Sequence, residues 1–267
     1  MGAAEHRPAA EIAAELLPMV EERWAEREVA DIGDLNDVYL LLSYTRAFRA
    51  FETIRDLAVD GRNDDALVLL RSFVSVILRG LYVVASDDPD ERELRRRRIV
   101  HEEIEFEEKR LRVGGGHPGE EGRLPELQKL LQESGEWFDE RDASPAIPNE
   151  ADVADALGLP ALYQIIYRIA SKTTHHSLFA MVGGFDGEFQ PGEFIRPVPL
   201  RKLTPEFTEN VLLWAIIAYA ELLERAEQVV QLGIAEPMRE LVLPWLETHP
   251  YRVHPDEQPL EEADALP

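Results

Sequence analysis

Cysteine is absent from this chain of 267 residues, and long apolar runs are missing. Without thiols the chain forms no disulfide, thiolate metal cluster or cysteine nucleophile, and this composition favours a reducing cytoplasm. The longest apolar run, residues 211–220, is about half as long as a membrane span requires. Residues 1–11 also lack the apolar stretch of a secretory signal. We therefore expect a soluble cytoplasmic protein with no membrane partner.

Basic residues are few, because 28 lysines and arginines oppose 52 acidic residues and give a formal net charge of −24. The averaged field of such a chain repels phosphate, so we expect no nonspecific binding to DNA. A nucleic-acid substrate would need a local site. The nucleic-acid partner that remains compatible with this charge is a specific RNA.

Signatures of the common cofactor and metal enzymes are also missing. The chain has no glycine-rich dinucleotide loop, no Walker sequence, no Gly-x-Ser-x-Gly elbow and no His-Glu-x-x-His. His101, Glu105 and Glu108 share one helix face at a spacing that could hold a metal, but this segment is dense in charge, which is typical of a solvated surface. We therefore expect no cofactor and no metal site.

Helical periodicity dominates the chain, and sustained alternation of apolar and polar residues is nearly absent. The pattern predicts an all-α fold, a single helical bundle with peripheral short helices and one small hairpin around residues 190–192. Residues 1–30 form an N-terminal amphipathic helix, which Pro18 is expected to kink or split. Residues 31–232 form the bundle, and residues 233–267 form a short C-terminal helix with an acidic tail.

Caps, glycines and prolines give the bounds of the expected helices. These helices cover about residues 8–29, 34–60, 64–85, 88–113, 124–134, 150–157, 160–181, 204–232 and 237–246, with a polar loop over 135–149. The connection at residues 61–63 is so short that the helices on either side form an antiparallel hairpin. The segment 211–220 is apolar on every side of its helix, so we expect it at the centre of the bundle or in a subunit interface.

A polar stripe runs along the otherwise apolar helix over residues 64–85, where Arg71, Ser75 and Arg79 are spaced four residues apart. An arginine in such a place needs a carboxylate or a phosphate, because an unpaired buried charge is costly. We expect Arg71 to pair with Glu52 or Asp56 on the preceding helix. Binding of a ligand or partner is the alternative.

A second constellation lies on the helix over residues 160–181. At about 100° per residue, one side of this helix carries a phenol, a hydroxyl, an imidazole and two cations. These are Tyr167, Ser171, His175, Arg168 and Lys172, and His176 follows directly. Imidazole suits proton transfer near neutral pH, and guanidinium suits a developing phosphate charge. A hydrogen-bond network that fixes helix packing is the alternative explanation.

Two motifs carry a resemblance to a known family. The sequence Leu70-Arg71-Ser72, followed by Tyr167, Ser171, His175 and Ser177 in the pattern Tyr-x3-Ser-x3-His-x-Ser, resembles an uncharacterised, mostly prokaryotic all-helical family over about residues 35–181. Members of that family usually carry a glutamate four residues after the arginine, where this chain has Ser75. The resemblance implies a helical domain of unknown function.

More distantly, Arg168 followed by six residues and His175 resembles the Arg-x(4-6)-His motif of the HEPN superfamily, although catalytic members usually have a polar residue in place of Ile169. HEPN proteins are helical bundles, and many are dimeric, metal-independent ribonucleases of toxin and phage-defence systems. The resemblance implies that His175 is a general acid or base and that Arg168 stabilises the charge of the phosphorane. Substrate binding would then fall to Tyr167, Ser171, Lys172, His176 and Arg71.

Two hypotheses follow from these residues. The first is a HEPN-like endoribonuclease, and the second is a noncatalytic helical scaffold or sensor that binds a partner through its polar stripe. A groove open to solvent that joins Arg168 and His175 favours the first, and a sealed network favours the second. In either case we expect a homodimer formed through the helix over residues 211–220 or the one over 167–181, because both carry much apolar surface.

Overall fold

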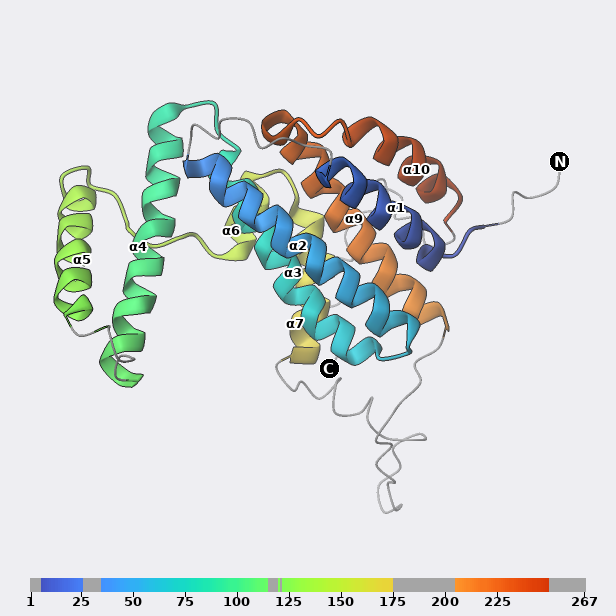
Figure 1. Cartoon of the computed structure of the whole chain (residues 1–267), viewed down its shortest axis with the longest axis horizontal. Helices are drawn as coiled ribbons and strands as arrows, with labels where there is room; N and C mark the ends of the chain where they lie inside the picture. The colour runs from blue at the N-terminus through green and yellow to red at the C-terminus, as the bar shows by residue number, and fades with distance from the viewer. Residues whose placement is uncertain (1–5, 26–34, 115–119, 121, 175–204, 250–267) are drawn as a thin grey trace, which may run out of the picture.

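The computed structural model describes residues 6–25, 35–114, 120, 122–174 and 205–249 (Figure 1). All regular elements in these ranges are helices, and none is a strand, which confirms the all-α prediction. The helices are α1 (Ala9–Ala25), α2 (Leu35–Val59), α3 (Asn63–Val84), α4 (Pro89–Gly114), α5 (Arg123–Asp139), α6 (Glu150–Ala156), the π-helix η1 (Leu162–Tyr167), α7 (Arg168–Thr174), α9 (Pro205–Val230) and α10 (Ala235–Thr248). The hairpin expected at residues 190–192 lies outside the described residues.

Helix α3 lies at the centre of the bundle and contacts α2, α9, α7, η1 and α6. Its apolar residues recur at helical spacing, so most of its circumference is covered by neighbouring helices. In the described part of the chain, α3 is also the one helix whose length and hydropathy would allow it to cross a membrane. More than half of its most apolar stretch is buried inside the bundle.

Helices α2 and α3 form the expected antiparallel hairpin. Gly61 adopts φ +76° at the end of α2, a left-handed conformation that glycine reaches without strain. Further along, the two helices approach closely at Gly80, where an added Cβ would lie only 2.6 Å from the Cβ of Ser43. Glycine is therefore needed at this position because a side chain would push the two helices apart.

Helix α9 completes the core beside α2 and α3. Its segment 211–220 is central in the bundle, which is one of the two outcomes predicted for this segment: Val211, Ala215 and Tyr219 are fully buried. The ring of Tyr219 stacks on Phe51 of α2 at 4.9 Å between centroids. This burial leaves little of the segment available for a subunit interface.

Two expectations about helix bounds are wrong, namely that Pro18 splits the first helix and that a loop begins at residue 135. Pro18 lies inside the uninterrupted helix α1 and does not split it, since the helix is held by six buried residues on one face. Helix α5 continues to Asp139, although a loop was expected from residue 135. Gly135 faces open space and is tolerated there, while the next turn places Phe138 in the contact with α4, where it is 1% exposed.

Helices α4 and α5 form an antiparallel pair that stands beside the bundle at the left of Figure 1. The charged face of α4 is only partly solvated, because α5 covers Glu108, which is 2% exposed and pairs with Arg112. His101 forms a hydrogen bond with Ser134 Oγ on α5 at 3.0 Å. Glu108 and His101 therefore each have a partner within the α4–α5 pair that accounts for the position of the side chain.

Candidate functional site

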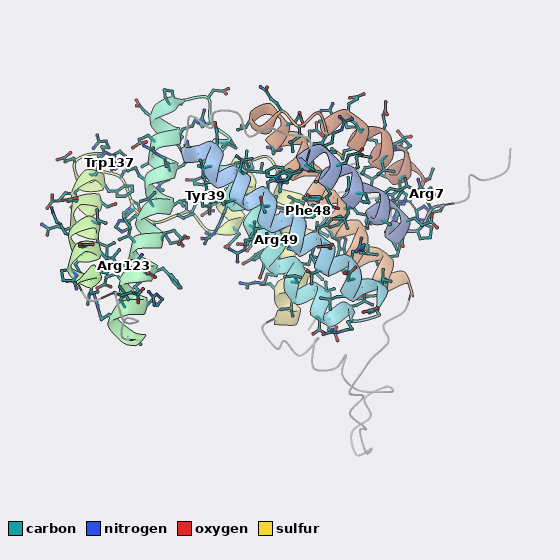
Figure 2. The ribbon with its side chains drawn as sticks, viewed as in Figure 1. Arg7, Tyr39, Phe48, Arg49, Arg123 and Trp137 are labelled. Atoms are coloured by element: carbon teal, nitrogen blue, oxygen red, sulfur yellow. The ribbon has the colours of Figure 1, made fainter. Side chains whose placement is uncertain are left out.

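A polar pocket of about 430 Å³ lies where α2 and α3 meet α4, α6 and η1. Its lining contains Tyr39, Leu42, Ser43, Arg46, Arg71, Ser72, Ser75, Val76, Arg79, Glu103, Glu150 and Tyr167. Figure 2 labels Tyr39, near the end of α2 that faces α4. Leu42, Arg46, Ser72 and Glu103 are exposed, so the pocket opens to solvent. The polar stripe predicted on α3 thus faces a single open pocket.

Arg71 joins α3 to the predicted catalytic helix. Its Nε donates a hydrogen bond to Ser171 Oγ at 3.0 Å, and its Nη2 donates to the hydroxyl of Tyr167 at 3.1 Å. The guanidinium also lies over the Tyr167 ring, 5.3 Å from its centroid. These contacts bring together three of the residues that the sequence analysis selected as substrate-binding.

The predicted pairing of Arg71 with Glu52 or Asp56 is wrong. Arg71 lies on the face of α3 that meets η1 and α7, whereas those two carboxylates belong to α2. Asp56 instead accepts two hydrogen bonds from its neighbour Arg55. Within the described ranges, both hydrogen-bond partners of Arg71 are uncharged hydroxyls, and its remaining N–H groups are available to a ligand.

The far end of the stripe carries both signs of charge. Arg79 pairs with Glu102 of α4 at 2.6 Å, and Ser75 donates to Glu150 at 3.1 Å. Arg46, one turn along α2 from the pocket residue Leu42, makes no hydrogen bond or ion pair with a described residue. The pocket therefore offers guanidinium donors beside carboxylate acceptors.

Tyr39 adds a neutral hydroxyl to this pocket. Burial raises the pKa of Tyr39, and the neighbouring carboxylates Glu103 and Glu102 raise it further, against the opposing effect of Arg79. The phenol therefore stays protonated at neutral pH. It can donate or accept a hydrogen bond but does not act as a base there.

Arg168 does not share the pocket. It is exposed, and its Nη1 donates to Gln164 one turn earlier at 3.0 Å. The hydrogen bonds that border the pocket therefore involve Arg71 and not Arg168. Lys172 lies in α7 with its side chain outside the described part of the structure, and His175 and His176 follow beyond the described residues.

The catalytic helix predicted from residue 160 begins with a π-helical turn, which the spacing of its residues does not reveal. In η1 the rings of Tyr163 and Tyr167 stack at 5.3 Å between centroids. Such wide turns are uncommon and often lie at functional sites. From Arg168 onward the helix is α-helical, and the projection that placed Tyr167 and Ser171 on one side is confirmed by their shared partner Arg71.

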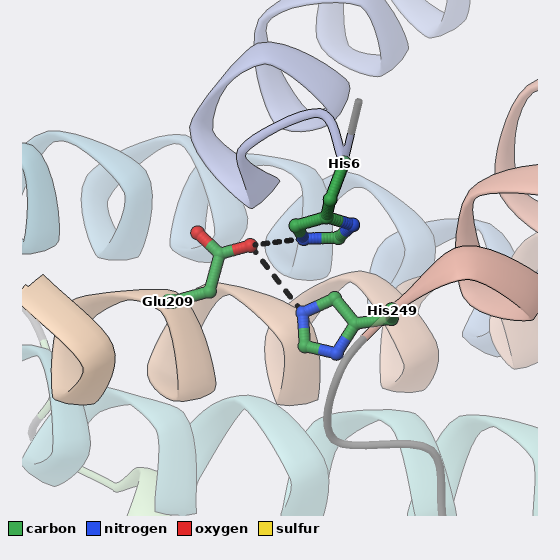
Figure 3. Close-up of side chains that lie close together, drawn as sticks. All are labelled: His6, Glu209 and His249. Atoms are coloured by element: carbon green, nitrogen blue, oxygen red, sulfur yellow. Dashed lines mark hydrogen bonds and ion pairs between the residues drawn. The ribbon is translucent and has the colours of Figure 1, made fainter. Parts of the chain in front are cut away.

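Two further features involve α9 and α10. A largely apolar cavity of about 680 Å³ lies between η1, α9 and α10. Its lining includes the half-buried side chains of Trp214 and Ile217 of α9. A cluster of His6, Glu209 and His249 joins the chain before α1 to α9 and to the end of α10 (Figure 3). The sequence analysis missed this cluster because its members are 203 and 40 positions apart and form no local motif.

One comparison with known proteins gives a match. A family model described as "Family of unknown function (DUF5677)" matches residues 37–190, more than half of the chain. This range includes the complete lining of the polar pocket. It includes none of the residues His6, Glu209 and His249. No curated protein and no solved structure matches the chain.

Proposed function

The chain belongs to the DUF5677 family of unknown function, and we propose that it is a HEPN-like endoribonuclease acting on a specific RNA in the cytoplasm, as part of a toxin or phage-defence system. The observation that supports this most is the position of Arg71. Its guanidinium is held by Tyr167 and Ser171 and borders an open polar pocket. The pocket, and not the exposed Arg168, is the proposed site of the scissile phosphate.

An anion is the ligand that Arg71 fits best. A half-buried guanidinium between two uncharged hydroxyls keeps its full charge, and transfer of a charge out of bulk water is favourable only with an opposite charge nearby. Guanidinium presents paired N–H groups that match two oxygens of a phosphate. Arg46, which forms no ion pair with any residue in the described ranges, adds a second cation to the same pocket.

The carboxylates of the pocket favour a nucleotide over other anions as the ligand. Glu103 and Glu150 would repel a bare polyanion but can accept hydrogen bonds from ribose hydroxyls or base amino groups. A nucleotide presents both kinds of group within a few ångströms. The mixed lining also agrees with the net charge of −24, which disfavours indiscriminate binding of nucleic acid.

The proposed reaction uses the 2′-hydroxyl of the RNA as nucleophile. His175, four residues after Ser171, takes the 2′ proton in the first step or returns a proton to the leaving group. The 2′ oxygen bonds to phosphorus and the bond to the 5′ oxygen breaks, which leaves a 2′,3′-cyclic phosphate and a 5′-hydroxyl. Arg71 would stabilise the added negative charge on the phosphorane, a role that the sequence motif assigns to Arg168.

This proposal keeps the remaining predicted residues in supporting roles. Tyr167 and Ser171 fix the guanidinium of Arg71 and thereby position the phosphate. Lys172, His176 and Arg168 would contact the RNA outside the pocket. A homodimer would place two such pockets on one structured RNA, and the segment 167–181 is the proposed interface because 211–220 is buried.

Cleavage of RNA by purified variants tests the proposal. Wild type should cleave one species among tRNA, rRNA and mRNA, and both His175→Ala and Arg71→Met should abolish cleavage. Arg62→Ala is the matched control, because Arg62 pairs with Asp65 on the exposed surface. Absence of cleavage in the wild type across all three RNA classes, with loss of binding of a protein partner in Arg71→Met, would instead favour the scaffold, which binds its partner through the polar stripe that contains Arg71.

A further inference from the structure

His6, Glu209 and His249 converge on one point from three separate elements (Figure 3). His6 precedes α1, Glu209 lies near the start of α9, and His249 directly follows α10. The Nε2 atoms of both histidines lie 3.3 Å from the same oxygen, Oε1 of Glu209. The three atoms that could bind a metal lie within 4.8 Å of one another.

The spacing fits metal ligands better than it fits hydrogen bonds. Hydrogen bonds between nitrogen and oxygen are most often 2.9–3.0 Å long, and both contacts here exceed that range. Ligands that bind Zn²⁺ at 2.0–2.1 Å with tetrahedral angles are separated from each other by about 3.3 Å. Two edges of such a tetrahedron are therefore already present.

Crowding at the carboxylate supports the same conclusion. Oε1 of Glu209 also accepts a hydrogen bond from the backbone N–H of Ala9 at 2.8 Å. With two lone pairs, one oxygen cannot accept three well-formed hydrogen bonds. The bond from Ala9, which also reaches Oε2 at 3.0 Å, orients the carboxylate toward the two imidazoles.

The surroundings keep the histidines in place. The side chain of His249 is 1% exposed and that of His6 is 26% exposed. Trp245 lies against both imidazoles and donates through Nε1 to the carbonyl of Arg7 at 2.8 Å, which fixes the segment that carries His6.

We propose that His6, Glu209 and His249 bind one divalent transition-metal ion, Zn²⁺ being the best match. Two imidazole nitrogens and one carboxylate oxygen are a common donor set for Zn²⁺, and water completes the tetrahedron. The ion would join the segment before α1, the start of α9 and the end of α10. These residues lie outside the matched family range 37–190 and outside the polar pocket, so the site is separate from the proposed ribonuclease reaction.

Calorimetric titration of ZnCl₂ into tag-free, chelator-treated full-length protein tests this inference. One equivalent should bind, the melting temperature should rise on binding, and Co²⁺ in place of Zn²⁺ should give the visible absorption of a tetrahedral site. Mg²⁺, which prefers oxygen ligands, should not bind there. His249→Gln and Glu209→Gln should each weaken Zn²⁺ binding by at least about 100-fold, since each removes one of three protein ligands.

Two variants make the result unambiguous. His101→Gln is the matched control, because His101 bonds to Ser134 on the separate α4–α5 pair and should leave Zn²⁺ binding unchanged. If His249→Gln fails to fold, His6→Gln replaces it, as His6 is the more exposed ligand. Absence of Zn²⁺ binding in the wild type, or equal affinity in the wild type and in all the ligand variants, would overturn the proposal.

Discussion

Arg71 Nε and Ser171 Oγ lie 3.0 Å apart although the two residues are separated by 100 positions in the chain. This hydrogen bond ties the central helix α3 to α7, whose last described residue, Thr174, directly precedes the proposed catalytic residue His175 in the sequence. The bond is between a charge and a neutral hydroxyl, so it positions the guanidinium without cancelling its charge. A guanidinium positioned in this way keeps its positive charge, as the proposed binding of an anion requires.

Arg71→Met should separate stability from binding. The change removes two hydrogen bonds that a charged group donates to neutral hydroxyls, each worth about 1.5 kcal/mol at this half-exposed place, and it orphans no carboxylate, so we expect the free energy of unfolding to fall by less than about 3 kcal/mol. Affinity for a 3′-mononucleotide should fall at least about 10-fold, because the charge-assisted contact to phosphate is lost. Urea denaturation and calorimetric titration measure the two quantities.

Arg62→Met provides the comparison, since Arg62 lies on the surface in an ion pair with Asp65. It should change neither quantity appreciably. A loss of stability of 3 kcal/mol or more in Arg71→Met alone, about what loss of one partner of a buried ion pair costs, would mean that Arg71 is chiefly structural.

The reaction itself should require no metal ion. Because the attacking oxygen belongs to the RNA and guanidinium supplies the positive charge, cleavage should persist in EDTA and yield 2′,3′-cyclic phosphate ends. Resistance of the 3′ ends to ligation, until the cyclic phosphate is opened and the resulting monophosphate is removed, provides the measurement. Products with 3′-hydroxyl ends, or loss of cleavage in EDTA by protein that remains folded, would contradict this mechanism.

Helical spacing predicted most of the fold and part of the site. The hairpin of α2 and α3 follows from Gly61, and the shared side of Tyr167 and Ser171 follows from the helical repeat, because both depend on neighbours in the chain. The predicted partner of Arg71 was wrong because the spacing of residues does not reveal which helix packs on which face of α3.

Contacts between distant segments could not be predicted from local patterns. His6, Glu209 and His249 belong to three segments that only the tertiary fold brings together. The close contact of Gly80 with Ser43 likewise depends on how two helices cross. Gly135 was misread as a helix end because a glycine facing open space costs a helix about 1 kcal/mol, which packing of Phe138 offsets.

Gly80→Ala and Gly135→Ala should change stability in opposite directions. At Gly80 the new Cβ would lie 2.6 Å from Ser43 Cβ, and the resulting overpacking, about 1–3 kcal/mol, should exceed the roughly 1 kcal/mol that alanine contributes as a better helix former. At Gly135 nothing lies within 4 Å, so alanine should stabilise by about 0.5–1 kcal/mol. Urea unfolding of the two variants compares them directly, and equal shifts of the same sign would refute the close contact.

Tyr44 and Tyr219 should make the protein sensitive to alkali. Burial raises the pKa of both phenols above 10. Tyr44 raises the pKa of Tyr219 further, whereas the hydroxyl of Tyr219 lowers the pKa of Tyr44 and only partly opposes the effect of burial; the ring centroids are 6.3 Å apart. Between pH 10 and the higher folded pKa, the unfolded chain loses protons that the fold retains. Stability is therefore complete below pH 10 and falls as the pH rises, by about 1.4 kcal/mol per pH unit for each tyrosine.

Urea unfolding at successive pH values should show this slope in the wild type and a much smaller one in the double variant Tyr44→Phe, Tyr219→Phe. An identical slope in both proteins would assign the alkaline transition to other groups.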